Sequence, residues 1–158
     1  MMTCNSLTSF TTLLSTSQTA RKLLISTVLG ASVMASQAWA HGDVTPQKMD
    51  TSGLPQLGEE WEETNPYSGN EEAIKIGESA YAQNCARCHG LDGISGGIAP
   101  DLRKLEPGYD GDEWFVYRVR NGAVRNGVPY MPKMADYLSQ ETLWSIRSWL
   151  ETKYDENL

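Results

Sequence analysis

Histidine and cysteine are scarce in this chain, and that scarcity limits the metal sites it can build. The 158 residues include two histidines, His41 and His89, and three cysteines, Cys4, Cys85 and Cys88. A structural zinc site takes four ligands. Because Cys4 and His41 lie far along the chain from the other three, zinc would need a carboxylate from a position that no motif marks. A copper site at His41 would need a second histidine nearby, so we expect a solvated terminus there instead.

Positive charge is also scarce. Thirteen lysines and arginines stand against 20 aspartates and glutamates, which gives a net charge of −7. A strongly acidic chain is a poor match for the phosphate backbone, and this argues against a nucleic-acid partner. The chain also has no internal repeat and no strand pattern of useful length.

No apolar run in the chain is long enough to cross a bilayer comfortably. Arg21 and Lys22 precede an apolar segment from Leu23 to Ala38, and Ala38-Trp39-Ala40 supplies the small residues that precede a signal-peptidase site. We therefore expect residues 1–40 to be a cleaved signal peptide and the mature protein to be periplasmic. A retained membrane anchor is the alternative, and the long polar start leaves open a translation start after Met1.

The motif that dominates the remaining chain is Cys85-Ala86-Arg87-Cys88-His89. Two thiols three residues apart on one helical turn can each add to a vinyl group of haem, and the adjacent imidazole then reaches the iron. A thioredoxin-like redox pair would need flanking βαβ strands, which the sequence lacks, and a simple disulfide remains an alternative. The motif predicts one covalent haem c per chain, held by Cys85 and Cys88, with His89 as an axial ligand of the iron.

Three helices are predicted around this motif. Asn70 is a good cap for a helix from about Glu71 to Cys88, inside which Gly77 suggests the close approach of another backbone. Asp112 is expected to cap a middle helix that runs to about Arg120 and stops at Asn121-Gly122. Ser139 should cap a last helix from about Gln140 to Lys153, whose Ile146 and Trp149 suit the notch at Gly77 and Tyr81.

The segments between the helices are predicted to be irregular. Residues 41–69 form an extended acidic arm, and its aromatic residues Trp61 and Tyr67 suggest contact with the domain at its later end. Residues 90–99 form a glycine-rich loop, and prolines keep the segment from Val128 to Met134 out of a helix. We expect the domain itself to cover residues 70–158.

The whole pattern resembles a class I monohaem cytochrome c. The features that carry the resemblance are the C-x-x-C-H motif, Pro100-Asp101-Leu102, the helix end at Asn121-Gly122, Met131-Pro132 and the capped last helix. The resemblance implies an all-α fold of three or more helices wrapped around one haem. It also implies that the Pro100 carbonyl accepts a hydrogen bond from His89, and that Met131 is the distal iron ligand.

Met134 is the alternative distal ligand. Pro132 restricts the backbone of Met131, and Pro129 stiffens its approach, so this segment can hold a thioether in a fixed place. Met134 lies nearer the last helix and suits the role of an adaptable core side chain. We therefore favour Met131.

A closer resemblance links the chain to the soluble periplasmic cytochromes c that accept electrons from PQQ-dependent ethanol dehydrogenases. It rests on three segments: His41 to Pro46, Thr51 to Trp61 and Tyr130 to Leu138. The resemblance implies a one-electron carrier, expected to be a monomer without a membrane anchor once processed. Its donor would be a PQQ-dependent alcohol dehydrogenase, and its acceptor a terminal oxidase or another cytochrome.

Two other functions compete with the carrier. A small haem oxidoreductase of the peroxidase type needs an exchangeable distal position, and the sequence offers no distal histidine. A cytochrome subunit fixed in a larger dehydrogenase complex is the other rival. The charge distribution suggests oriented docking, because residues 103–133 carry six basic side chains against four acidic ones, and residues 41–72 carry eight acidic against one basic. Arg118, Arg120 and Arg125 belong to the basic stretch.

Overall fold

A computed structural model describes residues 45–158. The expected signal peptide and its cleavage point before His41 lie outside the described residues. Within them, no helix is both long enough and apolar enough to cross a membrane.

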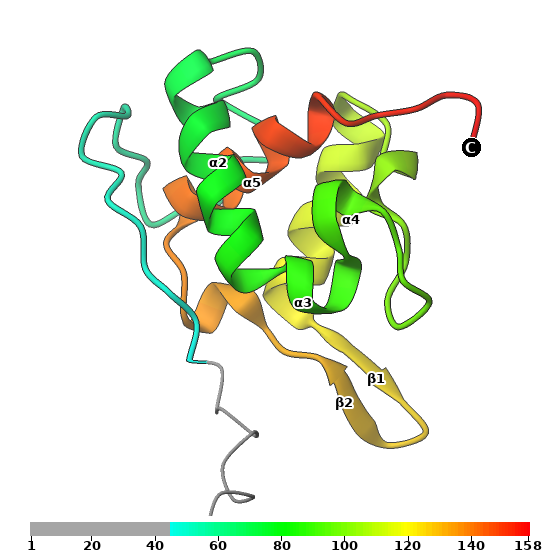
Figure 1. Ribbon diagram of the computed structural model, residues 1–158. Coiled ribbons are helices and arrows are strands. Elements are labelled where there is room, and N and C mark those ends of the chain that lie inside the picture. The colour runs from blue at the N-terminus through cyan, green and yellow to red at the C-terminus, as the bar shows by residue number, and fades with distance from the viewer. Residues whose placement is uncertain (1–44) are drawn as a thin grey trace, which may run out of the picture. The chain divides into compact units, whose positions relative to one another are not determined.

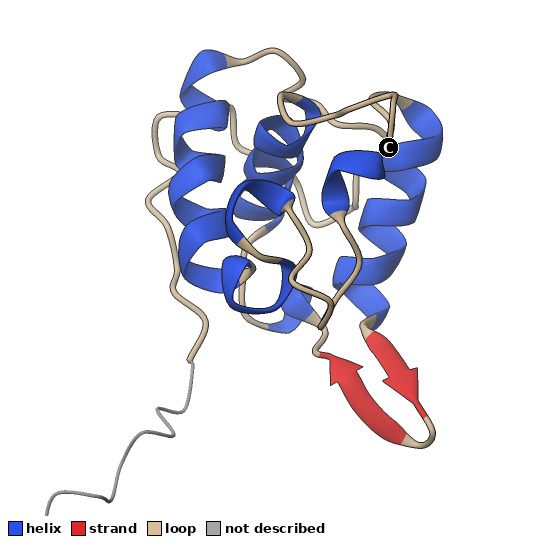
Figure 2. Cartoon of the chain, turned by 45° about the vertical axis from the view of Figure 1, so that its right-hand side comes forward, coloured by secondary structure: helices blue, strands red, loops and turns tan. Residues whose placement is uncertain are grey.

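The described chain is mainly helical, as predicted (Figure 1). Its elements, in order, are α2 (Glu71–Asn84), α3 (Ala86–His89), η2 (Leu91–Gly93), η3 (Leu102–Lys104), α4 (Tyr109–Asn121), β1 (Ala123–Arg125), β2 (Val128–Met131), η4 (Met134–Asp136) and α5 (Gln140–Glu151). The helices form one body from which a β-hairpin projects (Figure 2).

Helix α5 is the centre of the core. All of its residues from Gln140 to Leu150 are buried, although its sequence includes serines and charged side chains. Helix α2 packs across one side of it, where the Tyr81 and Trp149 rings lie 4.4 Å apart, and Phe115 of α4 contacts Trp144 at 6.0 Å between ring centroids. Ser139 caps α5 by accepting from the Thr142 amide, as predicted.

The first helix ends earlier than predicted. Asn70 caps it as expected, but α2 stops at Asn84, and Cys85 has φ −119°, which breaks the helix. The short helix α3 then begins at Ala86, with the amides of Cys88 and His89 both bonded to the Cys85 carbonyl. The motif therefore occupies a separate helical turn after α2.

The predicted cap of the middle helix is wrong. Helix α4 begins at Tyr109, after Gly108 with φ +95°, so Asp112 lies inside the first turn. The Asp112 carboxylate is buried and accepts from Arg147 Nε of α5 at 2.7 Å and from the Asn65 amide at 2.8 Å. A buried carboxylate is costly unless it is paired, and both partners of Asp112 come from other segments. Asp112 therefore joins α4 to α5 and to the arm.

The β-hairpin was not predicted, although its turn has a recognisable sequence. Asn126 and Gly127 connect the strands with φ of +51° and +77°, as a two-residue turn with left-handed backbone requires. The strands are antiparallel, with Ala123 opposite Met131 and Arg125 opposite Val128. Strands of three and four residues are too short for a period of two to stand out.

The arm from residue 45 to residue 69 contacts the domain over more of its length than its aromatic residues suggested. Tyr67 is buried, as expected, but so is Leu54 near the start of the arm. Side chains of α5 also bind the arm backbone: Glu141 accepts from the Leu57 amide at 3.0 Å, and Gln140 accepts from the Glu62 amide at 2.8 Å. The arm thus covers the side of α5 that would otherwise face solvent.

Candidate haem site

Neither cysteine of the motif is paired in a disulfide. Cys85 is half-buried at the junction of α2 and α3, and Cys88 is exposed one turn later. Burial raises the pKa of the Cys85 thiol to about 12, and the nearby charge of Cys88 raises it further. Redox cysteines of the thioredoxin type have lowered thiol pKa values, so this environment argues against that alternative.

The His89 imidazole is oriented by the loop that follows the motif. Its Nδ1 lies 3.0 Å from the Pro100 carbonyl oxygen. A carbonyl can only accept, so Nδ1 is the donor in this contact, and Nε2 is the ring nitrogen left to bind a metal. A histidine that binds a metal through one ring nitrogen usually donates the N–H of the other to a carbonyl or carboxylate in this way.

Two further contacts fix the shape of that loop. At its start, Gly90 has φ +80°, and its carbonyl accepts from the Tyr81 hydroxyl at 2.8 Å. At its end, the Asp101 carboxylate accepts from Arg103 Nη2 at 2.8 Å, and this pairing lowers the pKa of Asp101 to about 2. The loop that carries Pro100 is therefore anchored to α2 at one end and to η3 at the other.

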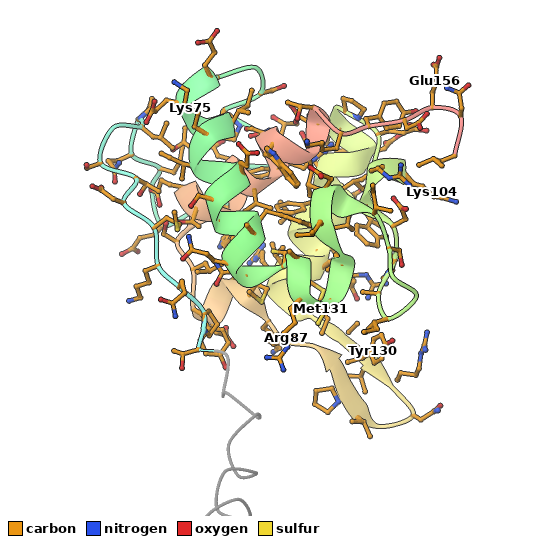
Figure 3. The ribbon with its side chains drawn as sticks, in the orientation of Figure 1. Lys75, Arg87, Lys104, Tyr130, Met131 and Glu156 are labelled. Atoms are coloured by element: carbon orange, nitrogen blue, oxygen red, sulfur yellow. The ribbon has the colours of Figure 1, made fainter. Side chains whose placement is uncertain are left out.

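The hairpin and the end of α4 position Met131. The residue lies at the end of β2 and packs, half-buried, against the core. The preceding helix ends at Gly122, where a side chain would collide with the Met131 carbonyl. Figures 1 and 2 both place the end of β2 at the same end of the molecule as α3, and Figure 3 shows Met131 between α3 and the hairpin in that view.

Met134 has different surroundings. It begins η4, is 6% exposed, and belongs to the buried core with Leu138. This environment suits a side chain that fills space between helices.

The donor set of these segments fits a covalently bound haem. It comprises two cysteine sulfurs outside any disulfide, the Nε2 atom of His89 and the thioether of Met131 at the end of β2. Apolar side chains stand exposed on the neighbouring loop and hairpin, and a large apolar ligand would cover such a set: Leu91, Ile94, Ile98, Val124 and Val128. Across residues 45–158, no three side chains of histidine, cysteine, aspartate or glutamate gather to hold a bare metal ion. The zinc alternative therefore finds no support in this part of the chain.

One residue beside the site had no predicted role. The Tyr130 hydroxyl, next to Met131 in sequence, donates to the Ile98 carbonyl in the loop that leads to Pro100. An aromatic residue before Met-Pro is the only signal in the sequence, and it does not reveal a partner 32 residues away.

The fold and the donor set thus define a small helical protein built to hold one haem through a C-x-x-C-H turn. Comparison with known proteins agrees with this class. The profile of the family described as "Cytochrome C oxidase, cbb3-type, subunit III" matches residues 72–150. Cytochrome c550 of Pseudomonas aeruginosa is 63% identical over 129 residues, which cover 79% of this chain and 89% of that protein.

Two more distant relatives are much longer chains. The quinohemoprotein alcohol dehydrogenases ADH-IIG and ADH IIB of Pseudomonas putida are 35% identical over 83 residues and 32% identical over 93 residues. These matches cover 52% and 58% of this chain but only 11% and 13% of the dehydrogenases. No solved structure matches the chain.

The chain therefore belongs to the cytochrome c family. It carries covalent haem c and is an electron-transfer protein, not an enzyme. The rival interpretation as a small haem oxidoreductase is thereby set aside.

Proposed function

We propose that this cytochrome is a periplasmic one-electron carrier that accepts electrons from a PQQ-dependent alcohol dehydrogenase, with ethanol as the substrate of that donor. It passes them to a terminal oxidase or to another cytochrome. The observation that carries the proposal is the similarity of residues in this chain to a segment of two quinohemoprotein alcohol dehydrogenases. Because these alcohol dehydrogenases contain a segment similar to this cytochrome, the similarity supports a role in accepting electrons from an enzyme of that kind.

The residues of the site have separate roles in this proposal. Cys85 and Cys88 would hold the haem through thioether bonds, His89 Nε2 and the Met131 sulfur would bind its iron, and the Pro100 carbonyl would fix the imidazole. Haem iron with both axial positions filled exchanges single electrons and leaves no position for oxygen or peroxide, and a methionine ligand raises its reduction potential. The buried position of Met134 supports Met131 as the ligand.

The proposed division of the chain follows the same assignment. Residues 1–40 are a signal peptide, residues 41–69 an acidic arm and residues 70–158 the cytochrome domain. The intact mass of protein purified from a periplasm with a haem-attachment system should equal residues 41–158 plus one haem. The double variant Cys85→Ala, Cys88→Ala should lose the added mass of the haem. A wild-type mass equal to the bare polypeptide would refute covalent attachment.

The donor is tested directly by mixing. The oxidised holoprotein is combined with a purified PQQ-dependent alcohol dehydrogenase, and ethanol is added while the absorption band of reduced haem is followed. We expect rapid reduction that needs both the enzyme and ethanol. Ascorbate serves as a control that the haem can be reduced. If ascorbate reduces the protein and the dehydrogenase with ethanol does not, the proposed donor is wrong.

A subunit fixed in a larger complex is a second candidate, because the matching family profile is described as an oxidase subunit. Gel filtration distinguishes the two. A free carrier elutes as a monomer and does not co-elute with the dehydrogenase at micromolar concentration, whereas a fixed subunit co-elutes with its complex.

A further inference from the structure

The hairpin contains an irregularity at Tyr130. Ala123 pairs with Met131 and Val124 pairs with Pro129, so the strands change register between these pairs and Tyr130 has no partner opposite it. An extra residue of this kind is a β-bulge, which turns a side chain away from the regular pleat. Tyr130 is therefore aimed out of the hairpin.

The tyrosine ring reaches from the hairpin to the loop after the haem motif. Its hydroxyl donates to the Ile98 carbonyl, and the Arg125 guanidinium covers the ring at 4.7 Å from its centroid. A cation over an aromatic face holds that ring in place. The bulge, the stacked arginine and the hydrogen bond together fix one orientation of Tyr130.

The loop of residues 90–99, which Tyr130 contacts, also has hydrogen bonds of its own, but these do not involve Ile98. Ser95 accepts from the Gly97 amide at 3.0 Å and donates to the Ala99 carbonyl at 2.5 Å, so these bonds stay within the loop. Around Gly96 and Gly97 there is open space, with no neighbouring atom within 4 Å of the position that a Cβ would take. The Tyr130 hydroxyl therefore ties an exposed loop apex to the hairpin.

This bond joins the two segments that flank the haem site. Tyr130 immediately precedes Met131, while Ile98 lies two residues before Pro100, whose carbonyl faces His89 Nδ1. We propose that Tyr130 is a positioning residue that, by binding the Ile98 carbonyl, restrains the strand carrying Met131 and keeps its sulfur at the iron. The inference rests on the proposed ligand role of Met131.

Loss of the Tyr130 hydroxyl should shift the equilibrium between two forms of the holoprotein. In the first form Met131 is bound to the iron, and in the second Met131 has dissociated from it. Without the hydroxyl, the strand and the loop are no longer tied, and the second form gains conformational freedom. A single neutral hydrogen bond of ordinary strength corresponds to roughly a fivefold shift of that equilibrium.

The test uses the ferric holoprotein and the Tyr130→Phe variant. The absorption band of sulfur bound to ferric iron is followed as the pH is raised, since alkaline solution promotes replacement of the methionine. We expect the pH at which half of the band is lost to fall by roughly 0.7, the equivalent of a fivefold shift for a one-proton step. The equilibrium constant for global unfolding should rise by no more than the same fivefold factor, because unfolding breaks the same hydrogen bond.

Tyr137→Phe is the matched control. Tyr137 is 49% exposed, lies seven residues further on, and its hydroxyl forms no hydrogen bond within residues 45–158. The Tyr137→Phe variant should lose the absorption band at the same pH midpoint as the wild type. Arg125→Gln, which removes the stacked cation, should move the midpoint in the same direction as Tyr130→Phe but by less.

Two results would overturn the inference, and they can be told apart. If Met131→Ala abolishes the band while Tyr130→Phe leaves its midpoint unchanged, or shifts it no more than Tyr137→Phe does, the positioning role is wrong and the ligand assignment stands. If Met131→Ala retains the band, the ligand assignment is wrong and the positioning role falls with it.

Discussion

Gly77 of α2 lies against the backbone of Ser145 in α5, so closely that a Cβ at position 77 would collide with the Ser145 carbonyl oxygen. The two helices can cross here only because glycine has no side chain. The crossing also brings the Tyr81 ring to 4.4 Å from that of Trp149, and the haem motif begins at Cys85, directly after α2. The position of the site therefore depends on this contact.

We predict that Gly77→Ala destabilises the holoprotein. Alanine is the better helix former by about 1 kcal/mol, but here its methyl group would push two backbones apart, which costs about 1 to 3 kcal/mol and occasionally more. We expect a net loss of about 1 to 2 kcal/mol in the free energy of unfolding, measured by guanidinium titration. Glu78→Ala, at the exposed neighbouring position, is the control and should change little. If Gly77→Ala is as stable as the wild type, α2 and α5 can move apart at no cost and the prediction is wrong.

We predict that Met131 and Met134 respond differently to replacement. Met131→Ala should abolish the absorption band of sulfur bound to ferric iron and lower the reduction potential, because water or lysine stabilises ferrous iron less well. Met134→Ala should keep the band and lose about 2 to 5 kcal/mol of stability, as expected for a side chain that is only 6% exposed. Absorption spectra and a redox titration of both variants decide the matter. Retention of the band in Met131→Ala together with its loss in Met134→Ala would reverse the assignment.

We predict that part of the basic stretch directs docking to the electron donor. The structure separates its arginines: Arg120 covers Trp61 of the acidic arm at 5.2 Å, whereas Arg118 covers Trp114 and Arg125 covers Tyr130. Reversing Arg118 and Arg125 to glutamate should slow reduction by the dehydrogenase about tenfold at low salt and weaken its salt dependence, well beyond the effect of Arg125→Gln, which removes the contact with Tyr130 without reversing the charge.

The control for this prediction is Lys75→Glu, an equal change of charge for one residue. Lys75 is 72% exposed and lies in Figure 3 at the opposite end of the molecule from Met131. Stopped-flow measurements at several ionic strengths compare the variants. If the rate and its salt dependence are the same for wild type, control and double reversal, the charges serve only solubility.

We predict that the loop carrying Pro100 loses stability in acid. The bond from Arg103 lowers the folded-state pKa of Asp101 to about 2, below its ordinary 3.8. A lowered pKa means that the ionised form stabilises the fold, so this contribution is present above pH 4 and is lost as the pH falls towards 2. Asp101→Asn should therefore differ most from wild type above pH 4 and converge with it near pH 2.

The measurement is the free energy of unfolding by denaturant at intervals from pH 6 to pH 2. Asp136→Asn, at an exposed aspartate, is the control and should follow the wild type throughout. A difference between Asp101→Asn and wild type that does not change with pH would show that the Asp101 charge is unimportant.

The sequence by itself determined the features that depend on neighbouring residues. Asn70 and Ser139 cap α2 and α5 as predicted, because a capping side chain bonds amides only two or three residues ahead. The spacing of Cys85 and Cys88 is equally local. Gly77 could be interpreted correctly as a close approach, since glycine inside a helix needs such a reason.

Only the tertiary structure decided the contacts between distant segments. Asp112 looked like a helix cap, yet its partner is Arg147, 35 residues on, and nothing local to either residue marks the pair. The arm looked free over most of its length, but Glu141 binds its backbone 84 residues away. Tyr130 likewise meets Ile98 across 32 residues. These hydrogen bonds form only after packing has brought distant segments together. The preferences of neighbouring residues therefore cannot predict them.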